Sequence, residues 1–581
     1  MKKLTGVSVS PGIVIGKHFL YQGSEFQDIP RYAIGKNQVD GEWRRLLAAT
    51  EEAAADVRDL HDKAVREMSK DKADIFEAHL MMLEDTEFQA QIKERLEADR
   101  ENIEWIVWDI SREIAAKMLS SPDPYFRERA GDVADVSRRL MHKLMGIKEF
   151  SLADLAEDVI LVAHDLLPSE VLSMNKERVK GIAMDMGGRT SHTAILAKAF
   201  GIPAVLGLSS ITRELNAGDI LALDGGSGQV IINPTKASLL KYADAGKRYR
   251  RNRDKLLAQA ELPAETKDGH RVLLKANIEL PEEAEQSLRY GAEGIGLYRS
   301  EFLFLTPGQA AEEEWQYQAY SSVLKAMGDR PVTIRTLDVG GDKVSSNVPA
   351  PSDGDKNPLL GWRAIRMCLA LPDFFKTQLR AILRSSVHGK VKIMFPMISG
   401  IEELEQALTL LEEARAECLA KKQRFAKTIE VGIMIEVPSA AMSADILARK
   451  SDFFSIGTND LLQYTLAVDR GNERVSYLAQ PFHPAVLRLL KQTIDAAHER
   501  GIKAAICGEL AGAPYAAPIL LGLGLDEYSM TASAIPQVKR IIRGTTLEDC
   551  RTLAEKALAN SSYKQTDALV KTWMADHFPD K

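Results

Sequence analysis

The 581-residue chain has few cysteines, few aromatic side chains and no long uninterrupted apolar run. Its four cysteines form neither a CxxC pair nor a zinc-ligand spacing, and a disulfide framework needs many more cysteines in far fewer residues. No stretch approaches the ~20 apolar residues of a transmembrane helix, and Met1-Lys2-Lys3 leads into a strand-like pattern rather than a signal-peptide core. We therefore expect a cytoplasmic protein with reduced thiols that does not cross a membrane.

The chain also lacks a strong charge of either sign. Its 75 Lys and Arg residues against 82 Asp and Glu residues leave a formal net charge of −7, which gives no footprint for nucleic acid. With 45% hydrophobic and 27% charged residues it can build large cores under an ordinary surface, which excludes disordered and fibrous classes. Its length is several times the ~150 residues of a typical domain, so we expect two or three domains.

The N-terminal half has the pattern of a helical bundle inserted into an α/β domain. Residues 6–20 alternate apolar and small side chains around a Pro-Gly turn, which indicates two short strands. Residues 37–144 change to helical spacing with hardly any glycine, and residues 158–233 return to short strands and turns. Because the opening strands have no partner nearby, we expect them to join the later α/β segment.

The C-terminal half alternates buried-strand runs with helices from about residue 263. Polar residues follow nearly every strand, so the alternation favours a closed (β/α)8 TIM-type barrel over an open sheet. The basic helical stretch before it is interpreted as a solvated linker helix rather than a nucleic-acid site. The predicted parts are an α/β domain of residues 1–20 and 147–235, a helical bundle of residues 21–146, a linker helix of residues 236–262 and a barrel of residues 263–581.

One histidine lies in a turn rich in glycine and hydroxyl groups, Gly187-Gly-Arg-Thr-Ser-His-Thr, which leads into an amphipathic helix. At a helix start, an imidazole lies beside backbone N–H groups that have no partner in the helix and can hold phosphoryl oxygens. A lone histidine is more often structural than catalytic, but the surrounding glycines and hydroxyls favour a nucleophile. The sequence therefore predicts that His192 accepts a phosphoryl group.

Four arginines follow predicted barrel strands. Any one of them would ordinarily be a surface or salt-bridge residue, but four that converge on one face form a clamp for a small polyanion, because guanidinium forks match phosphate and carboxylate. These residues are Arg299, Arg335, Arg363 and Arg470.

Acidic side chains and one cysteine also follow barrel strands. Glu436 and Asp460 are candidate oxygen ligands for Mg²⁺, although they could instead simply pair with the arginines. Cys507 ends the strand run Ala-Ile-Cys, and a thiol at that face could protonate a carbanion or enolate. As a lone cysteine, it could equally be a core residue.

Several strings together resemble the enzyme I family, the phosphoenolpyruvate-protein phosphotransferases of the bacterial phosphoenolpyruvate:sugar phosphotransferase system. The resemblance covers nearly the whole chain, including Ile75-Phe-Glu-Ala-His-Leu-Met-Met-Leu-Glu-Asp, which is similar to the family's HPr-docking helices. The other strings are Gly-Gly-Arg-Thr-Ser-His-Thr, Gly-Ala-Glu-Gly-Ile-Gly-Leu-Tyr-Arg-Ser-Glu-Phe-Leu-Phe, Arg-Thr-Leu-Asp-Val-Gly-Gly-Asp-Lys, Asn357-Pro-Leu-Leu-Gly-Trp-Arg-Ala-Ile-Arg, Phe-Phe-Ser-Ile-Gly-Thr-Asn-Asp-Leu and Cys-Gly-Glu-Leu-Ala-Gly.

The resemblance implies a role for each matching residue. His192 would be phosphorylated and Cys507 would protonate the enolate, while Glu436 and Asp460 would hold Mg²⁺. The phosphoenolpyruvate pocket would be formed by Arg299, Arg335, Lys343, Arg363, Asn459, Asp460 and Arg470. The fold implied is a phosphohistidine swivelling domain with the inserted bundle, followed by the barrel as the substrate-binding and dimerisation domain.

Three positions depart from the family's usual pattern. Lys198 stands six residues after His192 where an arginine is common, which keeps the charge but loses the bidentate fork. Val171 follows Pro168-Ser-Glu where a hydroxyl is often found, and Ser300 follows Arg299 where threonine is usual. The first two bear on the tuning of His192 and leave its identity as the phosphoacceptor unchanged.

We therefore predict an enzyme that transfers the phosphoryl group of phosphoenolpyruvate to itself and then to HPr or a paralogue, releases pyruvate, and forms a homodimer. The same chemistry in a regulatory, nitrogen-type phosphorelay is one alternative. A pyruvate phosphate dikinase or phosphoenolpyruvate synthase would need an ATP-binding domain, and no glycine-rich nucleotide cradle precedes residue 150. A non-catalytic docking scaffold would require a broken site, and no predicted catalytic residue is missing.

Overall fold

The computed structural model divides the chain into two compact units, Met1–Arg251 and Asn252–Lys581, each described here by itself. The described residues are 1–21, 29–67, 79–119, 124–145, 152–166, 170–171, 174–188, 191–216, 218–304, 312–340, 357, 359–469, 472 and 474–579. The predicted domain boundaries at residues 20, 146, 235 and 262 stay predictions.

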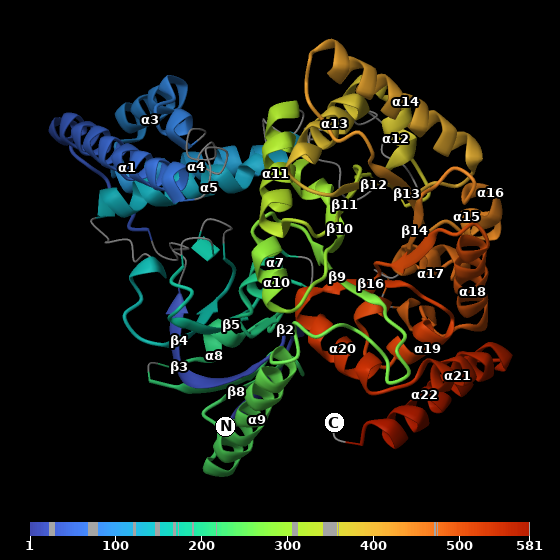
Figure 1. The fold of residues 1–581 in the computed structure, drawn as a ribbon. Coiled ribbons are helices and arrows are strands. Elements are labelled where there is room, and N and C mark those ends of the chain that lie inside the picture. The colour runs from blue at the N-terminus through green and yellow to red at the C-terminus, as the bar shows by residue number, and fades with distance from the viewer. Residues whose placement is uncertain are drawn as a thin grey trace. The chain divides into compact units, whose positions relative to one another are not determined.

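The N-terminal unit is built on a mixed sheet (Figure 1), which has eight strands among the described residues, in the order β1-β8-β7-β3-β4-β5-β6-β2. The strands are β1 (Lys2–Thr5), β2 (Val7–Ser10), β3 (Ile13–Tyr21), β4 (Val159–Ala163), β5 (Val179–Met184), β6 (Ala204–Leu206), β7 (Ile220–Asp224) and β8 (Gln229–Ile232). Strand β4 lies between β3 and β5 and is buried along its whole length, which explains its continuous apolar run. Strands β2 and β3 pair with β4, β6 and β7, as the sequence predicted, and β1, which it did not predict, pairs with β8.

A helical segment is inserted between β3 and β4. Its described helices are α1 (Val39–Glu67), α3 (Thr86–Asp99), α4 (Ile103–Leu119) and α5 (Pro124–Met145). Apolar side chains at helical spacing form one core, to which Leu46 and Val57 of α1, Leu96 of α3 and Val107 of α4 contribute. Helix α3 begins after Asp85, whose carboxylate accepts hydrogen bonds from two backbone N–H groups of the first turn.

The C-terminal unit is a closed parallel barrel, so the predicted (β/α)8 architecture is confirmed (Figure 1). The described residues form the strands β9 (Leu273–Ile278), β10 (Ile295–Arg299), β11 (Val332–Arg335), β12 (Val391–Phe395), β13 (Glu430–Ile435), β14 (Phe453–Ile456), β15 (Lys503–Ile506) and β16 (Glu527–Thr531). Strand β16 pairs with β9 and closes the sheet on itself, so all strands end at the same rim.

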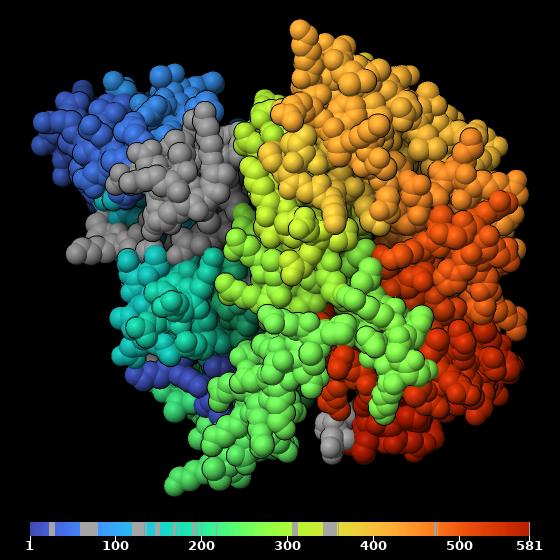
Figure 2. Space-filling model, viewed as in Figure 1, coloured from blue at the N-terminus to red at the C-terminus, as the bar shows by residue number. Residues whose placement is uncertain are grey.

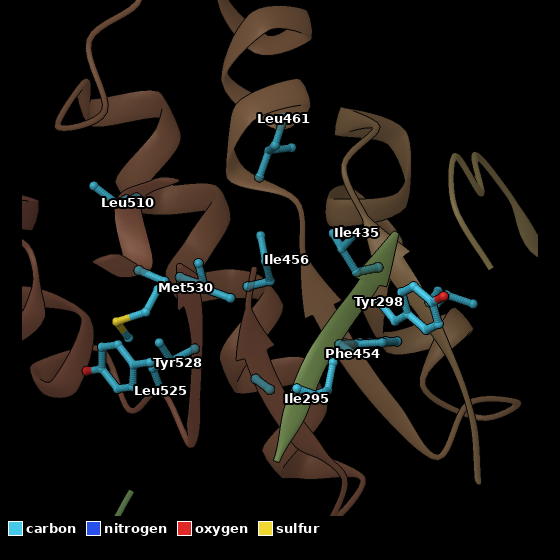
Figure 3. Close-up of a cluster of buried hydrophobic side chains, with 14 of the residues drawn as sticks. Ile295, Tyr298, Ile435, Phe454, Ile456, Leu461, Leu510, Leu525, Tyr528 and Met530 are labelled. Carbon is cyan, nitrogen blue, oxygen red and sulfur yellow. The ribbon is translucent and has the colours of Figure 1, made fainter. Parts of the chain in front are cut away.

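Helices surround the barrel strands. The longer ones are α10 (Glu283–Arg289), α11 (Glu313–Met327), α13 (Pro372–Ser385), α14 (Ile401–Ala420), α17 (Thr458–Leu466), α18 (Pro484–Glu499), α20 (Ile535–Arg543), α21 (Leu547–Ala559) and α22 (Tyr563–His577). The main core lies between strands and helices, and Figure 3 shows its side chains extending from several strands. The labelled members are Ile295, Tyr298, Ile435, Phe454, Ile456, Leu461, Leu510, Leu525, Tyr528 and Met530.

A second, smaller apolar cluster lies inside the barrel. Met394 belongs to it, whereas its strand neighbours Ile393 and Phe395 belong to the outer core, as expected when side chains alternate across a strand. Cys507, directly after β15, lies in this inner cluster with Met434 of β13. The four cysteines of the chain are buried and unpaired.

Helix α9 (Lys236–Leu257) corresponds to the predicted linker helix. Gly246 is its buried residue, and its basic side chains are exposed. Figure 2 shows this part of the chain as a green ridge on the surface. Among the residues that the structure describes, no helix is both long enough and apolar enough to span a membrane.

Candidate active site

The predicted phosphoacceptor lies at the start of helix α7 (His192–Phe200), beyond the end of β5. Gly187 has φ +98°, a conformation that favours glycine, and Ser191 caps the helix by accepting a hydrogen bond from Ala194 N–H at 3.3 Å. The Ser191 hydroxyl also lies 3.1 Å from the Gly188 carbonyl. The local sequence therefore places the backbone of His192 in the first turn of a capped helix. Its imidazole, like Arg189 and Thr190, lies outside the described residues.

The two departures near this turn differ in their surroundings. Val171 is fully buried, so its side chain has the environment of a core residue. Lys198 is exposed and lies in the last turn of α7.

The predicted carrier-docking segment 75–85 is described from His79 onward.

The sequence reasoning missed a histidine–aspartate pair at the same end of the sheet. His164 directly follows β4, and its Nδ1 lies 3.2 Å from Asp185 Oδ2, directly after β5. Asp185 also accepts hydrogen bonds from the backbone and hydroxyl of Thr212. The sequence signal was present, because each residue is the first one after a buried strand.

In the C-terminal unit, two of the four predicted arginines lie at the carboxyl ends of neighbouring strands. Arg299 ends β10 and Arg335 ends β11, and the two are paired in the register of these parallel strands. Arg299 is partly exposed and donates to Glu279 Oε1. The barrel therefore brings both guanidinium groups to one rim.

Arg335 is buried and held by two carboxylates. Its Nη2 lies 2.5 Å from Glu301 Oε1, and its Nη1 lies 2.9 Å from Asp338 Oδ2. Burial disfavours the charged guanidinium, but the nearby carboxylates of Glu301 and Asp338 outweigh that effect and raise the pKa of Arg335. It is therefore a fixed positive charge.

Arg363 shares Asp338 with Arg335. Its Nη2 lies 2.9 and 3.0 Å from the two oxygens of Asp338, and its Nη1 lies 3.7 Å from Asp460 Oδ1. Gly340 permits this approach, because a Cβ there would lie 2.2 Å from Arg363 Cβ. The shared carboxylate thus joins two arginines 28 positions apart in the sequence into one ion-pair cluster.

Glu436 directly follows β13 and is fully buried. Its Oε1 accepts a hydrogen bond from Met397 N–H at 2.7 Å, while its Oε2 has no partner among the described residues. Burial raises the pKa of Glu436 to about 8, and the negative charges of Asp460 and Asp338 add to that effect. An unpartnered buried carboxylate oxygen beside Asp460 suits a cation ligand. Even so, the described residues contain no cluster of three or more His, Cys, Asp or Glu side chains that would hold a metal ion without help from substrate oxygens.

Cys507 and Asn459 complete the rim as far as it is described. Burial raises the pKa of the Cys507 thiol to about 11, so it is a protonated thiol at neutral pH. Asn459 Oδ1 accepts a hydrogen bond from Glu509 N–H at 3.1 Å. Gly508 lets α17 approach this loop, since a Cβ there would lie 1.9 Å from Thr458 Oγ1. Two predicted pocket residues, Lys343 and Arg470, lie outside the described residues.

Three acidic side chains that hold the arginines were not singled out from the sequence. Glu301 lies two residues after Arg299 but pairs with Arg335, and Glu279 pairs with Arg299 from the end of the preceding strand. Asp338 lies three residues after Arg335, and this spacing was the one available signal for a local pair.

Comparisons with known proteins agree with this architecture. Three family models match: "PEP-utilising enzyme, N-terminal" over residues 5–129, "PEP-utilising enzyme, mobile domain" over residues 155–228 and "PEP-utilising enzyme, PEP-binding domain" over residues 253–547. The PEP-binding model covers the rim residues described above, from Arg299 to Cys507.

Full-length relatives are also similar to this chain. The phosphoenolpyruvate-protein phosphotransferase of Haemophilus influenzae is 41% identical over 574 residues, which is 99% of each chain. That of Staphylococcus carnosus is 41% identical over 572 residues, 98% of this chain and 99% of its own. A solved solution structure of an Enzyme I protein is 39% identical, with a TM-score of 0.37, and covers 42% of this chain and 99% of its own. The chain belongs to the phosphoenolpyruvate-protein phosphotransferase family and is an enzyme.

Proposed function

We propose that phosphoenolpyruvate binds at the carboxyl rim of the barrel and phosphorylates His192, which then passes the phosphoryl group to a histidine of an HPr-type carrier. The observation that carries the proposal is the pair of buried guanidinium groups, Arg335 and Arg363, that share Asp338 beside the unpartnered oxygen of Glu436. Fixed guanidinium forks at a barrel rim suit a small phosphate and carboxylate substrate.

The arginines provide most of the electrostatic stabilisation in this proposal. Arg299, Arg335 and Arg363, with Arg470 and Lys343 as further members, neutralise negative charge on the phosphoryl and carboxylate oxygens, and Asn459 donates a hydrogen bond to them. The imidazole of His192 attacks phosphorus, so a P–N bond forms as the P–O bond to the enol oxygen breaks. The arginines are held by carboxylates before substrate arrives, which limits the reorganisation needed during reaction.

Glu436 and Asp460 would hold a divalent cation such as Mg²⁺ through their carboxylate oxygens. That cation, when bound, supplies positive charge to the substrate's own oxygens. Glu436 fits this role because it keeps one buried oxygen without a partner while the other is fixed by a backbone N–H.

Cys507 is the proposed acid that protonates the enolate carbon of the departing pyruvate. Its thiol lies in the inner cluster of the barrel, and its pKa of about 11 keeps it protonated across the neutral range. The proton moves from Sγ to carbon, and the thiolate is then reprotonated from solvent.

The helical segment of the N-terminal unit is the proposed docking surface for the carrier, and the barrel is the proposed dimerisation domain. One imidazole must reach both the barrel rim and the carrier, so the proposal requires the two units to move relative to each other. The same chemistry could serve sugar uptake or a nitrogen-type phosphorelay, and which carrier is labelled in a mixture distinguishes them.

The test is phosphorylation by ³²P-labelled phosphoenolpyruvate with Mg²⁺. The wild type should take up acid-labile label and His192→Ala should take up none, while His164→Ala serves as the matched control and should remain labelled. His164 suits this purpose because it lies at the same end of the same sheet and is paired with Asp185. Label that persists on His192→Ala would overturn the assignment of the nucleophile.

A further inference from the structure

A buried polar network ties helix α13 to the two strand ends that carry arginines. The Gln378 side-chain amide of α13 donates to Ser300 Oγ at 3.0 Å and to Tyr320 OH at 3.1 Å. Its carbonyl oxygen accepts from Leu337 N–H at 2.9 Å, and Ser300 Oγ donates to the Arg335 carbonyl at 2.6 Å. The side chains of Gln378, Ser300 and Tyr320 are fully buried or nearly so.

The contacts with Ser300, Leu337 and the Arg335 carbonyl each fall at or beside a residue of the proposed anion site. Ser300 follows Arg299 directly, and its hydroxyl bonds the backbone of Arg335 in the next strand. Leu337 lies between Arg335 and Asp338, so the Gln378 carbonyl fixes the backbone that presents both groups of this ion pair. One glutamine therefore joins the two rim segments that present three charged side chains of the cluster.

The hydrogen bonds of this network explain how it can fix the positions of the arginines. The two N–H groups of Gln378 and its oxygen all have partners, and a satisfied buried network fixes the groups that it joins. Guanidinium forks are effective only when held close to the productive geometry. An apolar side chain at position 378 would leave the N–H of Leu337 without this partner in a buried loop.

We propose that Gln378 and Ser300 are positioning residues for the phosphoenolpyruvate site and act by fixing the backbone of Arg299, Arg335 and Asp338. The inference rests on the proposed function and deepens it. It assigns a role to the Ser300 hydroxyl. Threonine, the usual residue of the family at this position, carries the same hydroxyl and could make the same hydrogen bonds.

Ser287 provides a matched control. It is a fully buried serine of α10 whose hydroxyl donates to the Ala284 carbonyl at 2.6 Å, the same length as the Ser300 bond to Arg335. Ser287 lies near the end of α10, which leads into the opposite, amino-terminal end of β10. Ser287→Ala removes the bond to the Ala284 carbonyl, whereas Ser300→Ala removes both the bond donated to the Arg335 carbonyl and the bond accepted from Gln378. Ser300→Ala should therefore lose more stability than Ser287→Ala, and only the change at position 300 lies beside the arginines.

The experiment measures single-turnover phosphorylation of the full chain by ³²P-labelled phosphoenolpyruvate with Mg²⁺, as rate against substrate concentration. The maximal rate divided by the half-saturating concentration should fall about tenfold in Ser300→Ala and further in Gln378→Met, the size of one or more lost buried hydrogen bonds. Ser287→Ala should match the wild type, and Ser300→Thr should restore wild-type values. In the double variant Ser300→Ala/Gln378→Met, the loss should be smaller than the product of the two single losses, because both act through one network.

Melting temperatures of the same variants separate positioning from folding. A kinetic loss in Ser300→Ala and none in Ser287→Ala, measured well below the melting temperature of both variants, supports the proposal. If the wild type takes up label and Ser300→Ala matches Ser287→Ala kinetically, or Ser300→Thr fails to rescue, the proposal is overturned while the proposed function stands. A wild-type chain that takes up no label would overturn the proposed function and this inference with it.

Discussion

Removal of the Cys507 thiol should separate phosphoryl transfer from formation of pyruvate. Phosphorylation of His192 needs the arginines, whereas protonation of the enolate needs an acid within reach of carbon. Cys507→Ala should therefore form phosphoenzyme at close to the wild-type rate. Enzymatic protonation should slow by about 10² to 10⁴-fold, the usual contribution of a positioned general acid. Cys550→Ala is the control, since that buried thiol lies on the outer helix α21 and bonds Thr545.

The buried environment of the Cys507 thiol also predicts how slowly this residue reacts with an alkylating reagent. With a pKa of about 11, Cys507 is ionised to only about one part in a thousand at pH 8, whereas an ordinary thiol of pKa about 8.5 is ionised to roughly a quarter. Alkylation by iodoacetamide requires the thiolate, so ionisation alone should slow labelling of Cys507 by more than about a hundredfold, and burial slows it further.

Rapid-quench sampling tests the predicted rates of phosphoenzyme and pyruvate formation in Cys507→Ala. Phosphohistidine and pyruvate are measured in the same time course, from phosphoenolpyruvate labelled stereospecifically with tritium at C3 and in deuterated water. A chiral methyl group in the pyruvate then reports protonation on the enzyme, and a racemic one reports protonation in solution. Mass mapping of alkylated peptides at pH 8 tests the ionisation. Equal slowing of phosphoenzyme and pyruvate in Cys507→Ala, or rapid alkylation of Cys507 in the folded chain, would refute this reasoning.

Two further predictions concern the charges around the rim. Asp338→Ala removes the carboxylate that Arg335 and Arg363 share, so it should destabilise the C-terminal unit by about 3 to 5 kcal/mol in denaturant unfolding, and a loss below about 1 kcal/mol would contradict the shared ion pair. Burial raises the pKa of Glu283 from its ordinary value of 4.5 to about 7, so between these values the folded carboxyl keeps a proton that the unfolded one has lost, and stability falls as pH rises across that window. Glu283→Gln should therefore gain melting temperature relative to wild type between pH 5 and pH 8, and a constant difference across that range would show that the carboxyl titrates normally.

The sequence alone was enough to predict the fold class, because periodicity depends on burial. Strand β4 is a continuous apolar run and β12 to β14 are mostly apolar, since most of their side chains are buried, and the spacing between runs leaves room for one covering helix. The sequence pattern also showed that a helical segment separates the opening strands from the strands with which they pair. Strand β1 was missed because Lys2–Thr5 at the sheet edge carries little apolar signal.

The sequence also pointed to the residues of the rim, since a parallel barrel brings every strand end to one face. It could not decide which charges would meet. Arg335 pairs with Glu301 from the neighbouring strand end, and Asp338 bridges Arg335 to Arg363, because loop backbone and a glycine at position 340 permit that approach. Partner choice of this kind depends on distances of a few ångströms between distant segments, and residue types alone do not encode it.

The environment of each group was likewise decided by the tertiary structure. Glu436 and Cys507 were identifiable as residues that follow strands, but their raised pKa values arise from desolvation by side chains of other strands. The role of Gln378 in contacting two rim segments was invisible in sequence, where it is one polar residue in an amphipathic helix. Local pattern thus determined which elements form and which residues end them, whereas long-range packing determined how those residues are paired, buried and held.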